Sequence, residues 1–168
     1  MTGARAMRVA VGDPRAAGAD YADAFEIRLP APDGRTAEQW IRDALERLPA
    51  PLRLVVVLVH RHVLRFRLAP LGAAGTVLGW RVAIDEPDIV VLETSSSLLD
   101  ATLVSRRAEP TRTSITTALR YRRPVLARVV WTVVGPLHRR IAPLLLERAA
   151  VVRSPATAGR TAGPGAAG

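Results

Sequence analysis

The chain has 168 residues, 49% of them hydrophobic, which is enough for one folded domain with its own core. It contains no cysteine, so disulfide bonds, thiolate metal sites and cysteine nucleophiles are excluded. The net charge is +9, and all 24 lysine or arginine positions are arginine, a bias typical of GC-rich coding sequences. The excess charge lies in the last third. Residues 1–105 hold 12 arginines against 13 acidic residues, whereas residues 106–168 hold 12 against 2.

Both ends of the chain are rich in alanine, glycine, proline and threonine and offer little to bury. We therefore expect flexible segments at 1–18 and 153–168 and a single domain over 19–152. The N-terminal residues lack the apolar segment of a secretory signal, so we expect a cytoplasmic protein. The apolar run over 124–152 is interrupted by Arg128 and by the His138–Arg140 cluster. We do not expect it to span a membrane, because a spanning helix needs about 20 mostly apolar residues in succession.

Apolar alternation predicts a first strand over residues 21–29, ended by the sequence PAPDG. One side of this strand is mostly apolar and consists of Tyr21, Asp23, Phe25, Ile27 and Leu29. An amphipathic helix is expected next, with Thr36 as its N-cap and Gln39 completing a capping box. It should end before Pro49.

The segment that begins at Pro51 combines strand-favouring valines with a periodic length of about 15 residues, and the length favours a second helix. This segment carries His60 and His62. Neither histidine has a third candidate ligand nearby in the sequence, so we expect no metal site.

Three or four further strands follow within residues 76–88, 89–97, 98–110 and 112–124, and the turn residues between them predict an antiparallel meander. In the first of these segments the side chains expected to share one face are Leu78, Trp80, Val82 and Ile84. The clearest alternation belongs to the last segment, with one face formed by Thr113, Ile115, Thr117, Leu119 and Tyr121.

A long amphipathic helix is expected over residues 124–152, with bends near Thr132 and Arg139 caused by Pro136 and Pro143. Its predicted apolar stripe consists of Leu126, Val130, Val133, Val134, Leu137, Ile141, Leu144 and Leu145. Arg128, Thr132 and Arg139 should lie on the opposite face.

The order of strand, two helices, antiparallel meander and long C-terminal helix resembles the helix-grip order of START-like proteins. The chain is similar to an uncharacterised bacterial family related to the polyketide cyclase and dehydrase (SRPBCC) group. The matching segments are YADAFEIRLP, TAEQWIRDALE, VLGWRVAIDEPDIVVLE, SSLLDATLV, ALRYRRP and the helix from Trp131 to Ala150. They cover about 21–150 and concern packing rather than chemistry. The expected fold class is therefore α+β, a START-like helix grip with a curved antiparallel sheet wrapped around the C-terminal helix.

The resemblance implies a pocket for a hydrophobic small molecule or lipid between the sheet and the C-terminal helix, and a solid core is an equal alternative. Alternation assigns the inner face of the sheet to Trp80, Val82, Leu92, Leu103, Ile115, Thr117, Leu119 and Tyr121. Val130, Val134 and Leu137 of the helix should lie opposite. We expect no cofactor and no metal. Catalytic residues are not assigned by any motif.

Two other functions remain open. A cyclase-like enzyme would need polar groups inside the pocket, and the few candidates are Tyr121, Glu93, Asp100 and Arg81. A nucleic-acid or anionic-membrane binder would use the arginine-rich last third, namely Arg106, Arg107, Arg112, Arg120, Arg122, Arg123, Arg139 and Arg140. We rank hydrophobic binding first, the enzyme second and the polyanion binder third.

Overall fold

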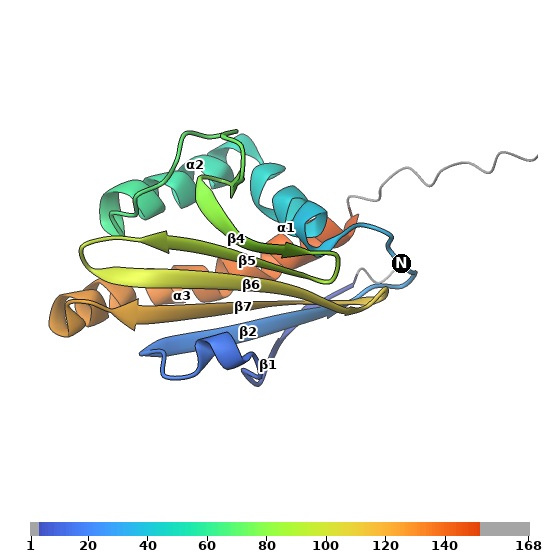
Figure 1. The fold of residues 1–168 in the computed structure, drawn as a ribbon, viewed down its shortest axis with the longest axis horizontal. Helices are drawn as coiled ribbons and strands as arrows, with labels where there is room; N and C mark the ends of the chain where they lie inside the picture. Colours follow the sequence, from blue (N-terminus) through green and yellow to red (C-terminus); the bar gives the residue numbers. More distant parts are fainter. Residues whose placement is uncertain (1–3, 152–168) are drawn as a thin grey trace, which may run out of the picture.

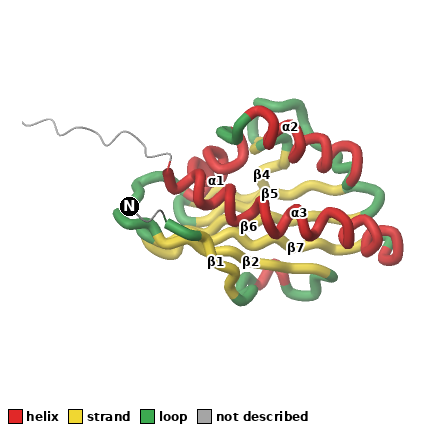
Figure 2. Tube along the Cα trace, turned by 180° about the vertical axis from the view of Figure 1, so that it is seen from behind, coloured by secondary structure: helices red, strands yellow, loops and turns green. Residues whose placement is uncertain are grey.

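A computed structural model describes residues 4–151, which form an α+β domain (Figure 1). One curved sheet of seven antiparallel strands carries the three α-helices on a single face, as Figure 2 shows from behind. The long C-terminal helix packs on this face, and the predicted helix-grip arrangement is confirmed. The tail over 153–168, for which we expected flexibility, lies outside the described residues.

The sheet has the strand order β1-β2-β7-β6-β5-β4-β3. Its strands are β1 (Ala6–Val9), β2 (Tyr21–Arg28), β3 (Thr76–Val77), β4 (Trp80–Glu86), β5 (Ile89–Ser95), β6 (Leu99–Glu109) and β7 (Arg112–Tyr121). The predicted first strand and the meander β4 to β7 are therefore present. After β2 the chain passes through two helices to the opposite edge of the sheet, where β3 lies. Strands β3 to β7 then follow one another across the sheet toward β2, so β7 pairs with β2.

Strand β1 occupies part of the N-terminal segment that we expected to be flexible. It pairs with residues 24–27 of β2, and the backbone N–H of Ala6 donates to Glu147 Oε1 of the C-terminal helix at 3.1 Å. Met7 remains 61% exposed. Main-chain hydrogen bonds therefore hold most of this strand in place. Because the strand buries little apolar surface, no hydrophobic pattern in the sequence indicates it.

The expected alternation in β4 fails at one point. The register with β5 shifts between Val82 and Ile84, which is the signature of a β-bulge. Because one extra residue reverses the facing of the side chains, Ile84 packs with Ile89, Val91 and Val104 in a small cluster separate from the main core. The prediction that Ile84 shares a face with Trp80 and Val82 is wrong for this reason.

The two short helices follow the prediction closely. Helix α1 (Ala37–Glu46) starts with the expected capping box, in which Thr36 and Gln39 exchange hydrogen bonds. Helix α2 (Ala50–Leu58) continues into η2 (Val59–Val63), a π-helical turn in which the N–H of Leu64 donates to the carbonyl of Val59. The segment from Pro51 is therefore a helix, and His60 lies in its π-helical turn.

Helix α3 (Pro124–Val151) is uninterrupted across Pro136 and Pro143, but it is rotated from the predicted orientation. Four members of the predicted stripe, Leu126, Val133, Leu137 and Leu144, are between 38% and 74% exposed. The residues that are buried instead are Ala127, Trp131, Val134, Gly135, Ala142, Leu145, Leu146 and Ala149. The buried face thus mixes alanine and glycine with large side chains, whereas the predicted stripe consisted only of leucine, isoleucine and valine.

No helix within residues 4–151 has the length and apolar character needed to cross a bilayer.

Candidate functional site

An apolar cavity of about 110 Å³ lies between the sheet and the helices. Its wall is contributed by α1, α2, η2, β4, β6, β7 and α3. An engineered cavity of about 150 Å³ in another protein is known to bind benzene, whereas sites for drug-sized ligands begin at about 300 Å³. At about 110 Å³ the cavity is smaller than both and too small for an extended lipid.

Seven of the eleven predicted ligand-binding residues line this cavity, namely Trp80, Leu103, Ile115, Thr117, Leu119, Val134 and Leu137. The other four are elsewhere. Leu92 is fully buried within the core, and Val82, Tyr121 and Val130 are partly buried against it. Alternation thus identified the inner face of the sheet, but it could not say which inner residues border the empty space.

One corner of the cavity is polar. Asp23 of β2 is only 1% exposed and lies opposite Thr117 of β7 in the sheet register. The Tyr21 hydroxyl donates to Asp23 Oδ2 at 2.5 Å, and Nε2 of His138 lies 3.2 Å from both carboxylate oxygens. His138 and Thr117 both line the cavity. We call Tyr21, Asp23 and His138 the polar corner.

The charges in the polar corner follow from these contacts. Burial raises the pKa of Asp23, but the hydrogen bond and charge of His138, followed by the Tyr21 hydroxyl, more than offset it and hold the pKa below 3.8. Burial, together with the nearby carboxylate, raises the pKa of Tyr21 to about 12. At neutral pH Asp23 is therefore a carboxylate and Tyr21 a neutral hydroxyl. Since a carboxylate only accepts, Nε2 of His138 carries a hydrogen.

Aromatic rings enclose the polar corner. The Trp131 ring lies 4.8 Å from Tyr21 and 5.4 Å from His138 between centroids. Gly135 makes room for it, since a Cβ there would lie 3.2 Å from Trp131 Nε1. That indole N–H is buried and has no hydrogen-bond partner among the described residues. The indole N–H therefore lies beside Gly135 of the same helix.

The opposite wall of the cavity contains His60. Burial, together with the charge of His138, lowers the pKa of His60 to about 4, so it is neutral at neutral pH. Its Nδ1 is 3.5 Å from the Trp80 indole nitrogen, and its ring makes edge contacts with Phe66 and Trp80. This wall therefore adds no charge. No group of three or more potential metal ligands occurs in residues 4–151.

The four acid–base candidates named from the sequence do not meet in the cavity. Arg81 pairs with Glu93 across two strands, and Asp100 pairs with Arg122, both at exposed positions. Tyr121 is half-buried at the end of β7, and its backbone N–H donates to Asp20. None of the four lines the cavity.

The residues of the polar corner were missed. Asp23 was placed on the apolar side of its strand, and His138 was counted as an interruption of an apolar run. A carboxylate on an otherwise apolar strand face was the available signal, because a buried charge needs a partner. The partner could not be named, since His138 is 115 residues away.

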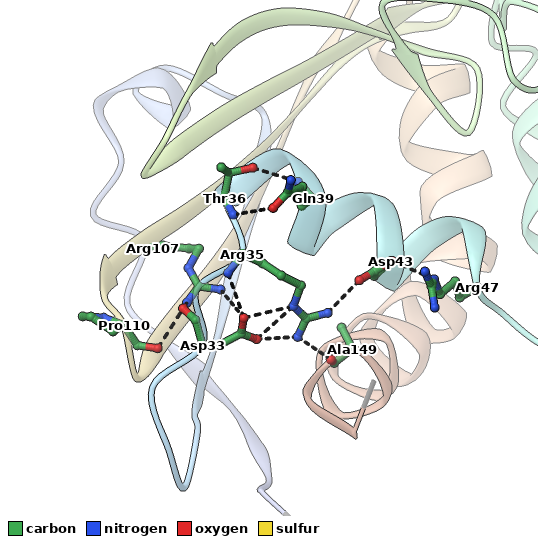
Figure 3. A network of polar contacts seen from close by, with 9 residues as sticks. All are labelled: Asp33, Arg35, Thr36, Gln39, Asp43, Arg47, Arg107, Pro110 and Ala149. Atoms are coloured by element: carbon green, nitrogen blue, oxygen red, sulfur yellow. Dashed lines mark hydrogen bonds and ion pairs between the residues drawn. The ribbon is translucent and has the colours of Figure 1, made fainter. Parts of the chain in front are cut away.

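A second buried charge cluster, which we call the Arg35 cluster, lies at the other end of the domain (Figure 3). The Arg35 guanidinium donates to Asp33, to Asp43 Oδ2 at 2.8 Å and to the carbonyl of Ala149 at 2.9 Å. Arg107 donates to the carbonyls of Asp33 and Pro110. The Arg35 cluster joins the loop before α1, the β6–β7 turn and the last turn of α3. None of its members lines the cavity.

Most arginines that could have formed a polyanion site are engaged within the protein. Arg106 pairs with Asp13, Arg112 with Glu109 and Arg122 with Asp100. Arg107 is buried, and Arg120 donates to two backbone carbonyls. No ion pair with an acidic side chain of residues 4–151 involves Arg123, Arg139 or Arg140.

No protein-family model matches the chain, and no curated protein and no solved structure matches it either.

Proposed function

We propose that this protein is a START-like binding module whose ligand is a small ring compound with one hydroxyl group, such as a phenol or a cyclic alcohol. The observation that carries the proposal is an apolar cavity whose wall contains the imidazole of His138, which is held by the buried carboxylate of Asp23. The helix-grip order of sheet and C-terminal helix supports the START-like assignment.

The size of the cavity limits the hydrophobic part of the ligand. A volume of about 110 Å³ accommodates one ring, and the surrounding wall is formed by aliphatic and aromatic side chains such as Leu103, Ile115 and Leu145. Burial of a ring there gains about 25 cal/mol for each Å² of apolar surface removed from water. The hydrophobic effect thus supplies the affinity, and the polar corner determines the orientation.

His138 determines the polar group. Its Nε2 is turned to Asp23, which leaves Nδ1 as an acceptor in the neutral ring and as a donor in the charged ring. A hydroxyl group can donate to the first form and accept from the second. An anionic ligand would be repelled by the buried Asp23 carboxylate, and a cation would find that carboxylate already shared by two donors. A neutral hydroxyl is therefore the best match.

Calorimetric titration with phenol and with toluene tests the proposal, because the two molecules have nearly the same shape and differ in the hydroxyl. We expect both to bind, with phenol at least as tight as toluene although toluene is the more hydrophobic. His138→Gln keeps a donor for Asp23 but loses the imidazole, and it should weaken phenol about tenfold and leave toluene unchanged. His62→Gln, at an exposed position, is the matched control.

Absence of toluene binding would refute the cavity as a site. Equal losses of both ligands in His138→Gln would refute the hydroxyl assignment alone.

A second candidate function, general base catalysis, is favoured by the same pair of residues. A carboxylate that fixes the tautomer and orientation of an imidazole beside a substrate cavity is the arrangement of many catalytic bases. The probe is isoxazole, which has a single ring. When its C3 proton passes to a base, its N–O bond breaks and the enolate of cyanoacetaldehyde forms. Saturable product formation that is lost in His138→Gln and kept in His62→Gln would support catalysis, and a rate equal to that of free imidazole would refute it.

A further inference from the structure

The outer sides of α2 and α3 expose large aliphatic side chains, and we call this surface the apolar face. Its main members are Leu54 and Leu58 on α2 and Val125, Val129, Val133 and Leu137 on α3, with exposed fractions between 38% and 80%. The four residues of α3 are spaced four apart, so they form one row along the helix. Both helices cover the same face of the sheet (Figure 2), and their outer sides point away from it. Exposed apolar surface of this kind marks an interaction site.

Positive charge accompanies the apolar face. The two stretches that contain α2 and most of α3, residues 47–84 and 110–146, hold 13 arginines and no aspartate or glutamate, and four of these arginines, Arg47, Arg81, Arg112 and Arg122, pair with acidic residues from other segments. Arg128, Arg139 and Arg140 of α3 are exposed, and none forms an ion pair with an acidic side chain of residues 4–151. The face therefore combines aliphatic side chains with uncompensated positive charge.

We propose that the apolar face docks on an anionic lipid bilayer, with its aliphatic row in the interfacial region and its arginines at the headgroups. Amphipathic helices that lie on membranes have this composition, and each arginine near an anionic surface strengthens the binding. A second copy of the chain fits less well, because a symmetric contact through this face would bring like-charged arginines together. A nucleic acid fits less well too, because aliphatic side chains do not stack with bases.

The cavity borders the same face. Val55 of α2 and Leu137 of α3 both line the cavity, and they are 41% and 38% exposed. They are therefore shared between the cavity wall and the apolar face. Docking would turn this wall toward the lipid, so that an apolar ligand could pass from the bilayer without crossing water.

Vesicle flotation tests the proposal. The full chain is mixed with vesicles of phosphatidylcholine alone or of phosphatidylcholine and phosphatidylglycerol in a two-to-one ratio. We expect it to float with the anionic vesicles and to lose most of this binding in high salt. Val133→Asp should reduce binding about tenfold or more. The matched control is Met7→Asp, because Met7 on β1 is also a well exposed apolar residue, at 61% against 74% for Val133, and this variant should bind like the parent.

Three outcomes would overturn the proposal. The first is the same flotation with neutral and anionic vesicles, and the second is equal binding by Val133→Asp and Met7→Asp. The third is a dimer by light scattering that Val133→Asp dissociates, because the face would then be a contact between copies. Both positions are exposed, so circular dichroism should show that both variants fold.

Discussion

The protein buries charged groups in two places, and the two are built differently. In the Arg35 cluster, three residues supply four oxygen acceptors to one guanidinium, and no member lines the cavity. In the polar corner, Asp23 is satisfied by Tyr21 and His138, but His138 still has one ring nitrogen for another partner. The comparison teaches that burial of charge by itself does not indicate function. What distinguishes a candidate site is an unused hydrogen-bonding position next to empty space.

The largest expected effect is the loss of the Arg35 guanidinium. Arg35→Ala leaves Asp33 without its main partner and Asp43 with only the exposed Arg47, and breaking a buried ion pair in this way costs about 3 kcal/mol or more. Urea unfolding should show this loss in the free energy of unfolding. Arg47→Ala is the control, since Arg47 also pairs with Asp43 but is 64% exposed, and it should cost less than about 1 kcal/mol. Equal losses of unfolding free energy in the two variants would mean that the buried Arg35 cluster does not stabilise this end of the domain more than an exposed ion pair does.

His60 in the cavity wall should make the free energy of unfolding depend on pH. The pKa of His60 is about 4 in the folded protein against 6.5 in the unfolded chain, so the unfolded state binds the proton more readily. The free energy of unfolding should therefore fall as the pH drops from 6.5 to 4, by on the order of 2 kcal/mol. Urea titrations at several pH values test this, and His60→Phe should flatten the curve. A slope that persists in His60→Phe would assign it to another group.

A smaller effect is expected in the polar corner. Asp23→Asn keeps one oxygen for Tyr21 or His138 but loses the charge, which should cost about 1.5 kcal/mol at neutral pH. Because the folded pKa of Asp23 lies below its ordinary value of 3.8, this contribution is full above that pH. The stabilising contribution of the carboxylate is lost as the pH falls through the pKa of Asp23 in the folded protein. The difference in unfolding free energy between parent and variant should therefore shrink only in acid, below the window of His60.

The smallest expected effect concerns the empty space. Ala142→Leu adds a side chain to the cavity wall, so it should abolish toluene binding while changing the free energy of unfolding by less than about 1 kcal/mol. Val133→Leu on the exposed side of the same helix should change neither quantity. Full toluene binding by Ala142→Leu would place the ligand outside this cavity.

The sequence was sufficient for most of the fold because its signals are local. The capping box of α1 and the alternation of β7 depend on residues a few positions apart, and both were predicted correctly. The short edge strand β1, the bulge after Val82 and the rotation of α3 were not predicted. Each depends on a partner elsewhere in the sheet or on close packing of small residues, and neither shows in hydrophobic periodicity.

The candidate site was harder to predict because it combines residues that are far apart in the chain. Trp80, Thr117 and Leu119 could be placed on the inner face from alternation alone. The pairing of Asp23 with His138 required the three-dimensional arrangement of β2 and α3, and the volume of the cavity depends on how closely α3 approaches the sheet.

The orientation of the side chains in one cavity wall depends on the number of residues in the π-helical turn at Val59–Val63. A π-helical turn holds one residue more than an α-helical turn, and each helical residue rotates the chain by about 100°. Deleting a single residue here would leave every strand intact but turn His60, Leu64 or Phe66 away from its present position. Related chains that differ by one residue in this turn would then share the fold and select differently shaped ligands.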